Sequence, residues 1–278
     1  MRMRSLLFVP GDRPDRMAKA LRSGADGLIL DLEDAVAPAA KPAARKAVAE
    51  FLKAHPNDAI WVRVNPLDSP ECEKDLAAVV PNHPDGIVLP KAEGGASVNE
   101  LARRLTEHGN ATAKILAIAT ETPAAIFQLG SYGGAKRLAG LTWGAEDLPA
   151  AIGASTSREA DGRYTAPYEL ARSLCLFGAA AAGVLPIETV FPAFKDKEGL
   201  AAYAVRARRD GFVGMMAIHP DQVHVINQAF TPTQQEIEHA RAVVAAFAAK
   251  PDAGALSLDG KMIDRPHLVQ AQRILSQL

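Results

Sequence analysis

Cysteine is scarce in this sequence, and neither sign of charge is in excess. The two cysteines, Cys72 and Cys175, are too few for a disulfide framework and lack the short spacing of a metal-binding motif. We therefore expect reduced thiols and a cytoplasmic protein. Lysine and arginine together number 31 and aspartate and glutamate 32, for a net charge of −1. Because this balance gives no overall basic excess, we expect no nucleic-acid partner.

Long hydrophobic runs are also missing. No apolar stretch approaches the roughly 18 residues that a membrane-spanning helix needs. Two arginines near the start precede the apolar residues 5–9, but this run ends at Pro10 and is shorter than the roughly 7–15 apolar residues of a signal peptide. We interpret it as a first strand and expect no membrane partner.

The sequence does contain a series of short apolar runs, several of which lead into charged residues. Near-continuous apolar strands belong in a parallel sheet that is buried on both faces. Strand and helix patterns alternate eight times, which favours an α/β fold of the (β/α)8 TIM-barrel type over an open sheet. The strands are expected at 5–9, 27–31, 60–64, 86–90, 115–119, 138–143, 184–187 and 213–218.

The length of the chain fits one barrel with an addition. A barrel typically needs about 250 residues, and the chain has 278. We assign 1–230 to the catalytic barrel and 231–278 to a C-terminal helical extension, which could dock elsewhere as an arm. Segment 146–165 is rich in Gly, Ser and Thr and should form a loop over the C-terminal face of the barrel. Helices are expected, among others, at 13–23, 41–54, 97–108, 167–182, 200–209, 220–229 and 233–249.

Acidic residues follow three of the strands, at the end where an α/β barrel builds its active site. Glu121 and Asp147 follow adjacent strands, and no cluster of Cys or His lies near them in the sequence. Such a pair suits a hard cation such as Mg²⁺, although two plain surface acids would give the same pattern. Glu33 and Asp34 close the second strand and could hold metal-bound water or simply begin a helix.

Basic residues complete this set of charged strand ends. Arg63 could present its fork to a carboxylate of the substrate, or form a structural salt bridge. Lys91 could neutralise a carboxylate or phosphate, or form a Schiff base, and the nearby acids favour a metal site over the Schiff base. Arg13 follows the first strand in a turn that suits an anion. His219, just before Pro220, is more typical of a structural histidine than of an acid or base.

Nine motifs, in order along nearly the whole chain, resemble those of one known family. They lie at 4–11, 30–36, 62–65, 89–91, 121–123, 144–148, 211–214, 218–223 and 260–264. The sequence is similar here to the citrate lyase β-subunit-like branch of the HpcH/HpaI aldolases. The resemblance is specific for the family and much less so for the substrate.

The resemblance implies a Mg²⁺-dependent carbon–carbon lyase. Its substrate would be a carboxylated 3-hydroxyacyl-CoA (citryl-, malyl- or citramalyl-CoA), cleaved reversibly to acetyl-CoA and a keto acid. Carried over by position, Glu121 and Asp147 would bind the metal, and Arg63 the substrate. The remaining roles are support of metal-bound water for Glu33 and Asp34, and contacts with CoA for Phe8, Arg13 and Lys19.

Asp264 would be the acid/base, supplied by the C-terminal arm to the site of a neighbouring subunit. This arrangement requires at least a dimer, and relatives are often trimers or hexamers or part of a lyase complex. Glu188 departs from the family pattern, in which Asp is usual, and its extra methylene could reposition a carboxylate near the site. Three alternatives stay open: a pyruvate-type aldolase acting on free hydroxy-keto acids, a non-catalytic CoA-binding subunit, and an added thioester hydrolysis.

Overall fold

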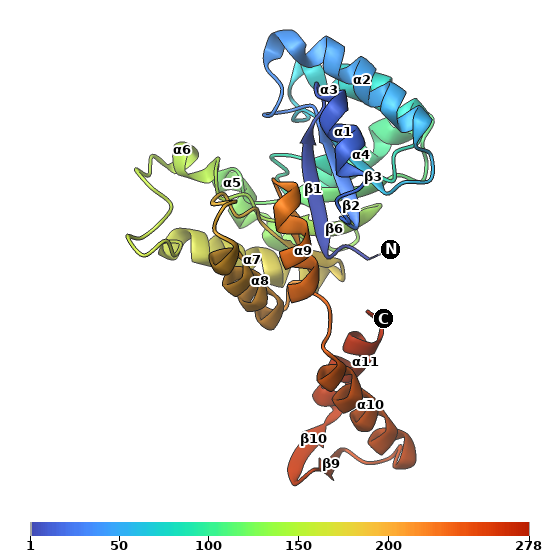
Figure 1. The fold of residues 1–278 in the computed structure, drawn as a ribbon, viewed down its shortest axis with the longest axis vertical. Helices are drawn as coiled ribbons and strands as arrows, with labels where there is room; N and C mark the ends of the chain where they lie inside the picture. Colours follow the sequence, from blue (N-terminus) through green and yellow to red (C-terminus); the bar gives the residue numbers. More distant parts are fainter. Residues whose placement is uncertain (1, 278) are drawn as a thin grey trace.

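Eight parallel strands pair in chain order and close into a barrel (Figure 1). The structure is a computed structural model and describes residues 2–277. The first and last strands close the barrel, with Ser5 opposite Met215. This confirms the expected TIM barrel. The strands are β1 (Ser5–Pro10), β2 (Gly27–Asp31), β3 (Ile60–Arg63), β4 (Gly86–Leu89), β5 (Lys114–Ile118), β6 (Leu138–Thr142), β7 (Leu185–Glu188) and β8 (Gly214–Ala217).

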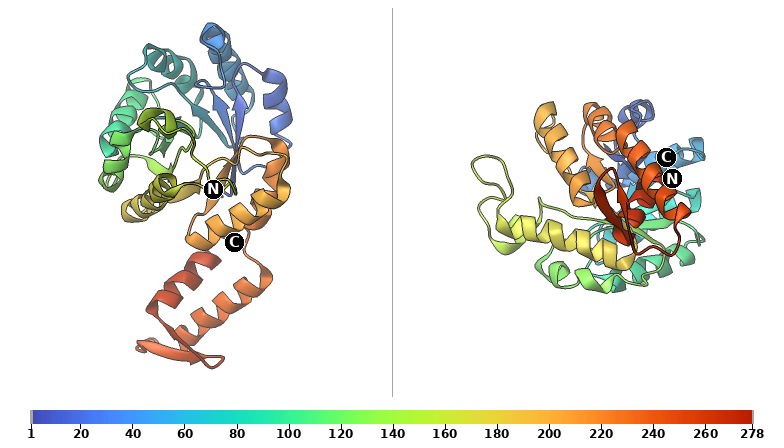
Figure 2. Two further views of the ribbon diagram at one scale, coloured as in Figure 1. Left: turned by 90° about the vertical axis from the view of Figure 1, so that its left-hand side faces the viewer. Right: turned by 90° about the horizontal axis from the view of Figure 1, so that it is seen from below.

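Helices follow the strands and pack around the outside of the barrel (Figures 1 and 2). Residues 70–79, which form α3, were not among the helices expected. They carry a start signal nonetheless, because the hydroxyl of Ser69 accepts a hydrogen bond from the Glu71 amide and Pro70 occupies the first turn. The barrel helices are α1 (Pro14–Ala20), α2 (Lys41–Ala54), α3 (Pro70–Val79), α4 (Gly95–Glu107), α5 (Pro123–Phe127), α6 (Leu148–Ile152), α7 (Ala166–Ala182), α8 (Lys197–Asp210) and α9 (Pro220–Ala229).

Side chains fill the interior of the barrel, so it is a packed core and not a pore. Trp61 occupies part of this interior and is fully buried. A Cβ atom at Gly86 would lie 2.2 Å from the Trp61 ring, so a residue without a side chain on β4 makes room for the indole of β3. The interior cluster comprises Met3, Leu6, Ile29, Trp61, Val88, Leu116, Ile118, Ile187 and Met216.

The C-terminal residues form an arm that stands away from the barrel (Figures 1 and 2). It consists of α10 (Gln234–Ala249), the antiparallel strands β9 (Ala255–Leu258) and β10 (Lys261–Asp264), and α11 (Arg265–Leu275). The predicted helical extension therefore also contains a hairpin. The arm has its own small apolar cluster of Ala240, Val243, Phe247, Ile263 and Ala271. Two terminal residues of the expected bounds lie outside the described residues. They are residue 278 of the extension and residue 1 of the barrel.

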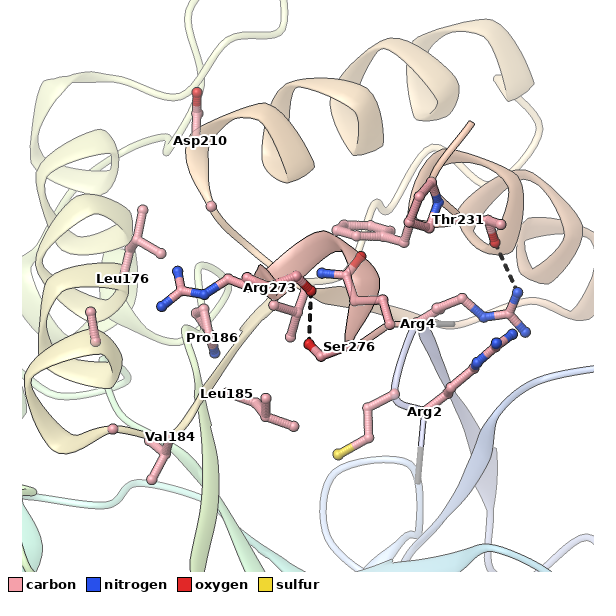
Figure 3. A pocket seen from close by; sticks show the side chains of 18 of the residues that line it. Arg2, Arg4, Leu176, Val184, Leu185, Pro186, Asp210, Thr231, Arg273 and Ser276 are labelled. Carbon is pink, nitrogen blue, oxygen red and sulfur yellow. Dashed lines mark hydrogen bonds between the residues drawn. The ribbon is translucent and has the colours of Figure 1, made fainter. Parts of the chain in front are cut away.

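A cleft separates the arm from the end of the barrel at which the strands begin. This arm cleft has a volume of about 610 Å³, and its lining combines apolar side chains with Arg2, Arg4 and Arg273. Figure 3 shows the side chains that surround it, including the hydrogen bond from Arg4 to the hydroxyl of Thr231, which measures 2.9 Å. Its described lining includes a single carboxylate, that of Asp210, so the arm cleft does not offer a set of ligands for a hard cation.

Within residues 2–277, no helix combines the length and the apolar character that crossing a membrane requires.

Candidate active site

The strand ends surround a cavity of about 350 Å³ at the opposite end of the barrel from the arm cleft. We call it the mouth cavity. Its apolar wall includes Phe8, Ile118 and Met216. The charged side chains among its lining residues are those of Arg16, Asp31, Asp34, Arg63, Glu121, Glu146 and Asp147. Asp34, Arg63, Glu121 and Asp147, which were expected at the strand ends, therefore line one cavity.

Arg63 directs its fork at Asp31, the last residue of the neighbouring strand β2. Its Nε and Nη2 atoms donate to the two carboxylate oxygens at 2.7 and 2.6 Å. The remaining Nη1 atom lies 3.0 Å from an oxygen of Glu33, and the guanidinium lies over the ring of Phe8, 4.9 Å from its centre. Burial alone would lower the pKa of Arg63, but the hydrogen bonds and charge of Asp31 outweigh it and raise the pKa. Arg63 is therefore held as a fixed cation.

Lys91 lies between two acids that follow different strands, β2 and β6. Its ammonium donates to Glu33 at 2.9 Å and lies 3.7 Å from an oxygen of Asp147. Burial raises the pKa of Glu33, despite the opposing charges of Arg63 and Lys91. Burial works against the charge of Lys91, but its bond to Glu33 outweighs it and raises the lysine pKa. A protonated lysine is a poor Schiff-base nucleophile, so this geometry favours charge neutralisation.

Glu121 is buried and is hydrogen-bonded to the backbone of Lys91. The Lys91 amide donates to a carboxylate oxygen of Glu121 at 2.5 Å. Lys91 has a left-handed backbone with φ of 50°, which is uncommon for a residue with a side chain and occurs at functional sites. Burial raises the pKa of Glu121 to about 8. Asp147 is half exposed and faces the ammonium of the same lysine.

The donor set of this pair fits a hard cation. Both donors are carboxylates, and burial, together with the nearby charges of Glu33 and Asp147, raises the pKa of Glu121, so a cation beside it would stabilise its charged form. Among residues 2–277, no three or more His, Cys, Asp or Glu side chains form a group that could hold a metal ion. A cation here would have two carboxylate ligands, with other positions left to water or substrate oxygens, which is how Mg²⁺ is commonly bound.

The residues of β1 and α1 that were expected to contact CoA do not all lie at the mouth cavity. Phe8 and Arg16 line the mouth cavity, whereas Arg13 and Lys19 are exposed and lie outside its lining. Arg13 precedes α1 and pairs loosely with Asp15, at 3.4 Å. Sequence reasoning missed Arg16, although its spacing of three residues from Lys19 places these two cations on one side of α1.

Asp264 lies outside the mouth cavity of its own chain. It begins α11, whose last turn lines the arm cleft at the other end of the barrel. In Figure 1, β10 lies at the part of the arm that is most distant from the barrel. The carboxylate contacts the ring of His267 at 2.5 Å, within the arm itself. Any role of Asp264 at a mouth cavity would therefore involve a second copy of the chain.

Glu188 is fully buried and does not line the mouth cavity. One oxygen accepts hydrogen bonds from Trp143, from the hydroxyl of Tyr203 at 2.9 Å and from the Thr189 amide at 2.9 Å. The other accepts from Arg172 at 2.7 Å. The longer side chain of Glu188 thus serves a network between the strands and the outer helices. It does not add a carboxylate to the cavity.

Two further features of the sequence have structural roles. His219 caps α9, with its ring accepting from the Asp221 amide at 3.2 Å, and it stacks on Phe194. The segment expected as a loop over the barrel contains α6 and then a stretch that projects beside α7 (Figure 1). Tyr164 anchors that stretch by packing edge-on against Trp143, with ring centres 4.9 Å apart.

The closed barrel with acids and bases at its strand ends belongs to the class of α/β-barrel enzymes. Over residues 169–277 the chain matches a model described as carbon–carbon bond lyase of the TIM-barrel fold. Over residues 4–220 it matches a model described as HpcH/HpaI aldolase/citrate lyase. The chain therefore belongs to the HpcH/HpaI aldolase/citrate lyase family, and it is an enzyme of the carbon–carbon lyase class.

Several relatives match almost the whole chain. A citrate lyase subunit beta-like protein of Mycobacterium tuberculosis is 38% identical, over 97% of this chain and 93% of its own length. A (3S)-malyl-CoA thioesterase of Cereibacter sphaeroides is 33% identical, over 99% and 94%. Among solved structures, protein CitE of Mycobacterium tuberculosis in complex with magnesium, acetoacetate and coenzyme A superimposes with a TM-score of 0.83. It is 36% identical, over 99% of this chain and 98% of its own.

Proposed function

We propose that the protein is a Mg²⁺-dependent lyase of a carboxylated 3-hydroxyacyl-CoA, such as citramalyl-, malyl- or citryl-CoA. It would release acetyl-CoA and a keto acid, and would also catalyse the reverse condensation. The observation that carries this proposal is the buried carboxylate of Glu121 beside Asp147, with Lys91 against both. The solved CitE complex with magnesium, acetoacetate and coenzyme A supports it by similarity.

Glu121 and Asp147 would hold the cation, which when bound supplies a Lewis acid that lowers the pKa of the substrate hydroxyl. Glu33 and Asp34 would orient water beside it, because Asp34 lines the mouth cavity and Glu33 lies against Lys91. Lys91 would offset part of the negative charge that these acids concentrate.

Arg63 would face the substrate carboxylate and the oxygen that gains negative charge as the bond breaks. Its plane is already fixed by both oxygens of Asp31, so little reorganisation is needed during the reaction. Prepositioned cations of this kind often contribute the largest part of catalysis. Nε and Nη2 bind Asp31 and Nη1 faces Glu33, so the substrate carboxylate would approach the open face of the guanidinium or share Nη1 with Glu33.

The carbon–carbon bond would break as the substrate hydroxyl gives its proton to the water that Glu33 and Asp34 orient. The bonding electrons then become the enolate of the acetyl thioester, and the hydroxyl carbon becomes the keto group. Asp264 would protonate the enolate carbon, or remove a methyl proton in the reverse direction. Because Asp264 lies outside its own mouth cavity, it would serve a second copy, and we propose a homo-oligomer, for which the family resemblance suggests a trimer or hexamer.

Arg16 and Lys19 of α1, with Arg13 just before the helix, would meet the phosphates of CoA, and Phe8 the part of the substrate that enters the cavity. Arg16 is the one of these three cations that lines the mouth cavity. Both cysteines are buried and free, which is typical of the reducing cytoplasm that we propose as the location.

The direct test is to incubate the protein with Mg²⁺ and each acyl-CoA and to identify the keto acid. Glu121→Gln or Asp147→Asn should abolish turnover with the fold intact, because each removes one anionic ligand. Glu146→Gln, at a neighbouring acid with no assigned role, should have a much smaller effect. Full activity after removal of metal by EDTA would rule out the metal mechanism.

A second candidate activity is hydrolysis of the thioester, because relatives 33% identical to this chain are named (3S)-malyl-CoA thioesterases. The same incubation separates the two activities. Cleavage gives a keto acid and acetyl-CoA, whereas hydrolysis gives a free thiol and an intact hydroxy acid. Faster cleavage of a free hydroxy-keto acid than of any acyl-CoA would favour the pyruvate-type aldolase instead.

A further inference from the structure

Thr120 and Gly144 join the ends of the two strands that precede the carboxylate pair. The Gly144 amide donates to the Thr120 hydroxyl at 2.9 Å, and this hydroxyl donates to the Gly144 carbonyl at 3.1 Å. Thr120 is fully buried. It directly precedes Glu121, and Gly144 lies three residues before Asp147. We call this pair of hydrogen bonds the Thr120–Gly144 clasp.

The clasp extends the contact between β5 and β6 beyond their backbone pairing. The pairing ends with Ile118 opposite Thr142, and one more backbone bond follows, from the Ala119 amide to the Thr142 carbonyl at 2.8 Å. The Thr120 hydroxyl then takes the place of the next backbone group. The hydroxyl therefore keeps the two chain segments aligned as far as Glu121, the next residue.

Gly144 contributes by having no side chain. A Cβ atom at this position would lie 2.6 Å from Cγ of Glu121, closer than real Cβ atoms approach other heavy atoms. The side chain of Glu121 therefore passes directly over the backbone of Gly144. Any larger residue would have to displace the Glu121 carboxylate, so the glycine and the hydroxyl act on the same pair of strand ends.

We infer that Thr120 is a positioning residue that sets the distance between the Glu121 and Asp147 carboxylates through the Thr120–Gly144 clasp. The inference rests on the proposed function, in that it takes these two acids as the cation ligands. Thr120 itself contacts neither substrate nor cation in this arrangement. A merely structural role would instead affect stability and leave cation affinity unchanged.

The test uses Mn²⁺, a paramagnetic substitute for Mg²⁺, and measures its binding to the full chain by electron paramagnetic resonance without substrate. Thr120→Val keeps the shape and loses the hydroxyl, and should weaken binding by about tenfold or more, as is typical when a residue that orients a metal ligand is changed. Thr120→Ser keeps the hydroxyl and should restore affinity close to that of the wild type. Gly144→Ala should weaken binding by displacing Glu121.

Thr142→Val is the matched control, because Thr142 is also fully buried at the end of β6 but its hydroxyl contacts only the sulfur of Met216, at 3.8 Å. It should bind Mn²⁺ like the wild type. An equal loss in Thr142→Val would overturn the inference, since any buried threonine would then matter. If Thr120→Val does not fold, Thr120→Ala, which also removes the hydroxyl, takes its place, and wild-type affinity in Thr120→Ala overturns the inference.

The outcomes separate the inference from the proposed function. If the wild type binds Mn²⁺ and Glu121→Gln does not, the cation site stands, and unchanged affinity in Thr120→Val then rejects the positioning role alone. If the wild type itself does not bind Mn²⁺, both the cation site and the role of Thr120 are rejected.

Discussion

At the scale of single residues, Lys91 makes the most varied contacts in the site. Its ammonium contacts Glu33 and Asp147, and its amide holds Glu121. Lys91→Met keeps an unbranched side chain on the same left-handed backbone but removes the charge. We expect Mg²⁺ to bind several-fold more tightly, because a like charge beside the cation is lost, while turnover falls. Isothermal titration with Mg²⁺ and a steady-state assay check both effects. Weaker Mg²⁺ binding would show that the ammonium matters mainly for positioning Asp147.

Glu121 makes cation binding depend on pH. Its pKa of about 8 in the metal-free protein means that the carboxyl is mostly protonated at neutral pH. A cation must displace this proton, so Mg²⁺ affinity should rise about tenfold per pH unit below pH 8 and level off above it. Titration of Mg²⁺ at several pH values, with magnesium-induced proton release measured in parallel, checks this prediction. Affinity that is flat from pH 6 to 8 would contradict it.

Arg63 tests how much the geometry of a cation matters. In Arg63→Lys the charge remains, but an ammonium cannot bind both oxygens of Asp31 and still reach toward Glu33. We expect turnover to fall by about 10²-fold or more, with the thermal midpoint of unfolding little changed. A loss below about threefold would assign Arg63 a structural role.

At the scale of elements, the network around Glu188 ties β6 and β7 to the outer helices. Glu188 and Arg172 are both buried, with side chains 0% and 3% exposed, so Glu188→Gln leaves a buried charge poorly paired. We expect a loss of about 3–5 kcal/mol in the free energy of unfolding, measured by urea denaturation. Asp210→Asn is the control, since Asp210 pairs with the same arginine but is 25% exposed. It should cost about 1 kcal/mol or less.

The strands and most helices could be predicted because the barrel repeats one simple pattern. Apolar runs such as 27–31 and 86–90 match β2 and β4 to within a residue, since strands buried on both faces have little freedom in composition. The hairpin of the arm was missed, although Asp259 and Gly260, with φ of 50° and 74°, are residues typical of a two-residue turn. Its strands are only four residues long, so their alternation of apolar and polar residues is too brief to stand out in the sequence.

The candidate site was predictable only in part, for a related reason. A charged residue after an apolar run marks the C-terminal end of a strand, and in an α/β barrel these ends lie on one face. Glu121, Asp147 and Arg63 could therefore be placed together from the sequence. Three other features depend on side-chain packing between elements. They are the bond of Arg63 to Asp31, the position of Arg16 at the mouth cavity, and the network that joins Glu188 to the outer helices. No local pattern encodes those contacts.

At the scale of the whole molecule, the arm tests whether active sites are shared between chains. We propose mixing Asp264→Asn protein, which has an intact mouth cavity, with Arg63→Ala protein, which has an intact arm. If the arm serves a neighbour, about a quarter of the sites in randomly mixed oligomers combine both intact parts. Activity should then reappear on mixing, measured after subunit exchange.

Each variant mixed with itself is the control and should stay inactive. Mass spectrometry of the intact mixture establishes that subunits have exchanged. No recovery in exchanged oligomers would mean that Asp264 acts within its own chain or has no catalytic role. The Asp264→Asn protein should still bind Mg²⁺, because Asp264 lies apart from Glu121 and Asp147.

The arm cleft has a consequence for the chain as a continuous thread. Arg2 and Gln277 both line it, so the two ends of the described polypeptide meet across one small space. The described backbone therefore begins and ends at the arm cleft, and joining residues 2 and 277 would close it into a ring. A short peptide could close that ring, and new ends could be opened at an exposed turn, to give a circularly permuted protein. Purification tags at either end would crowd the same cleft and press on the arm.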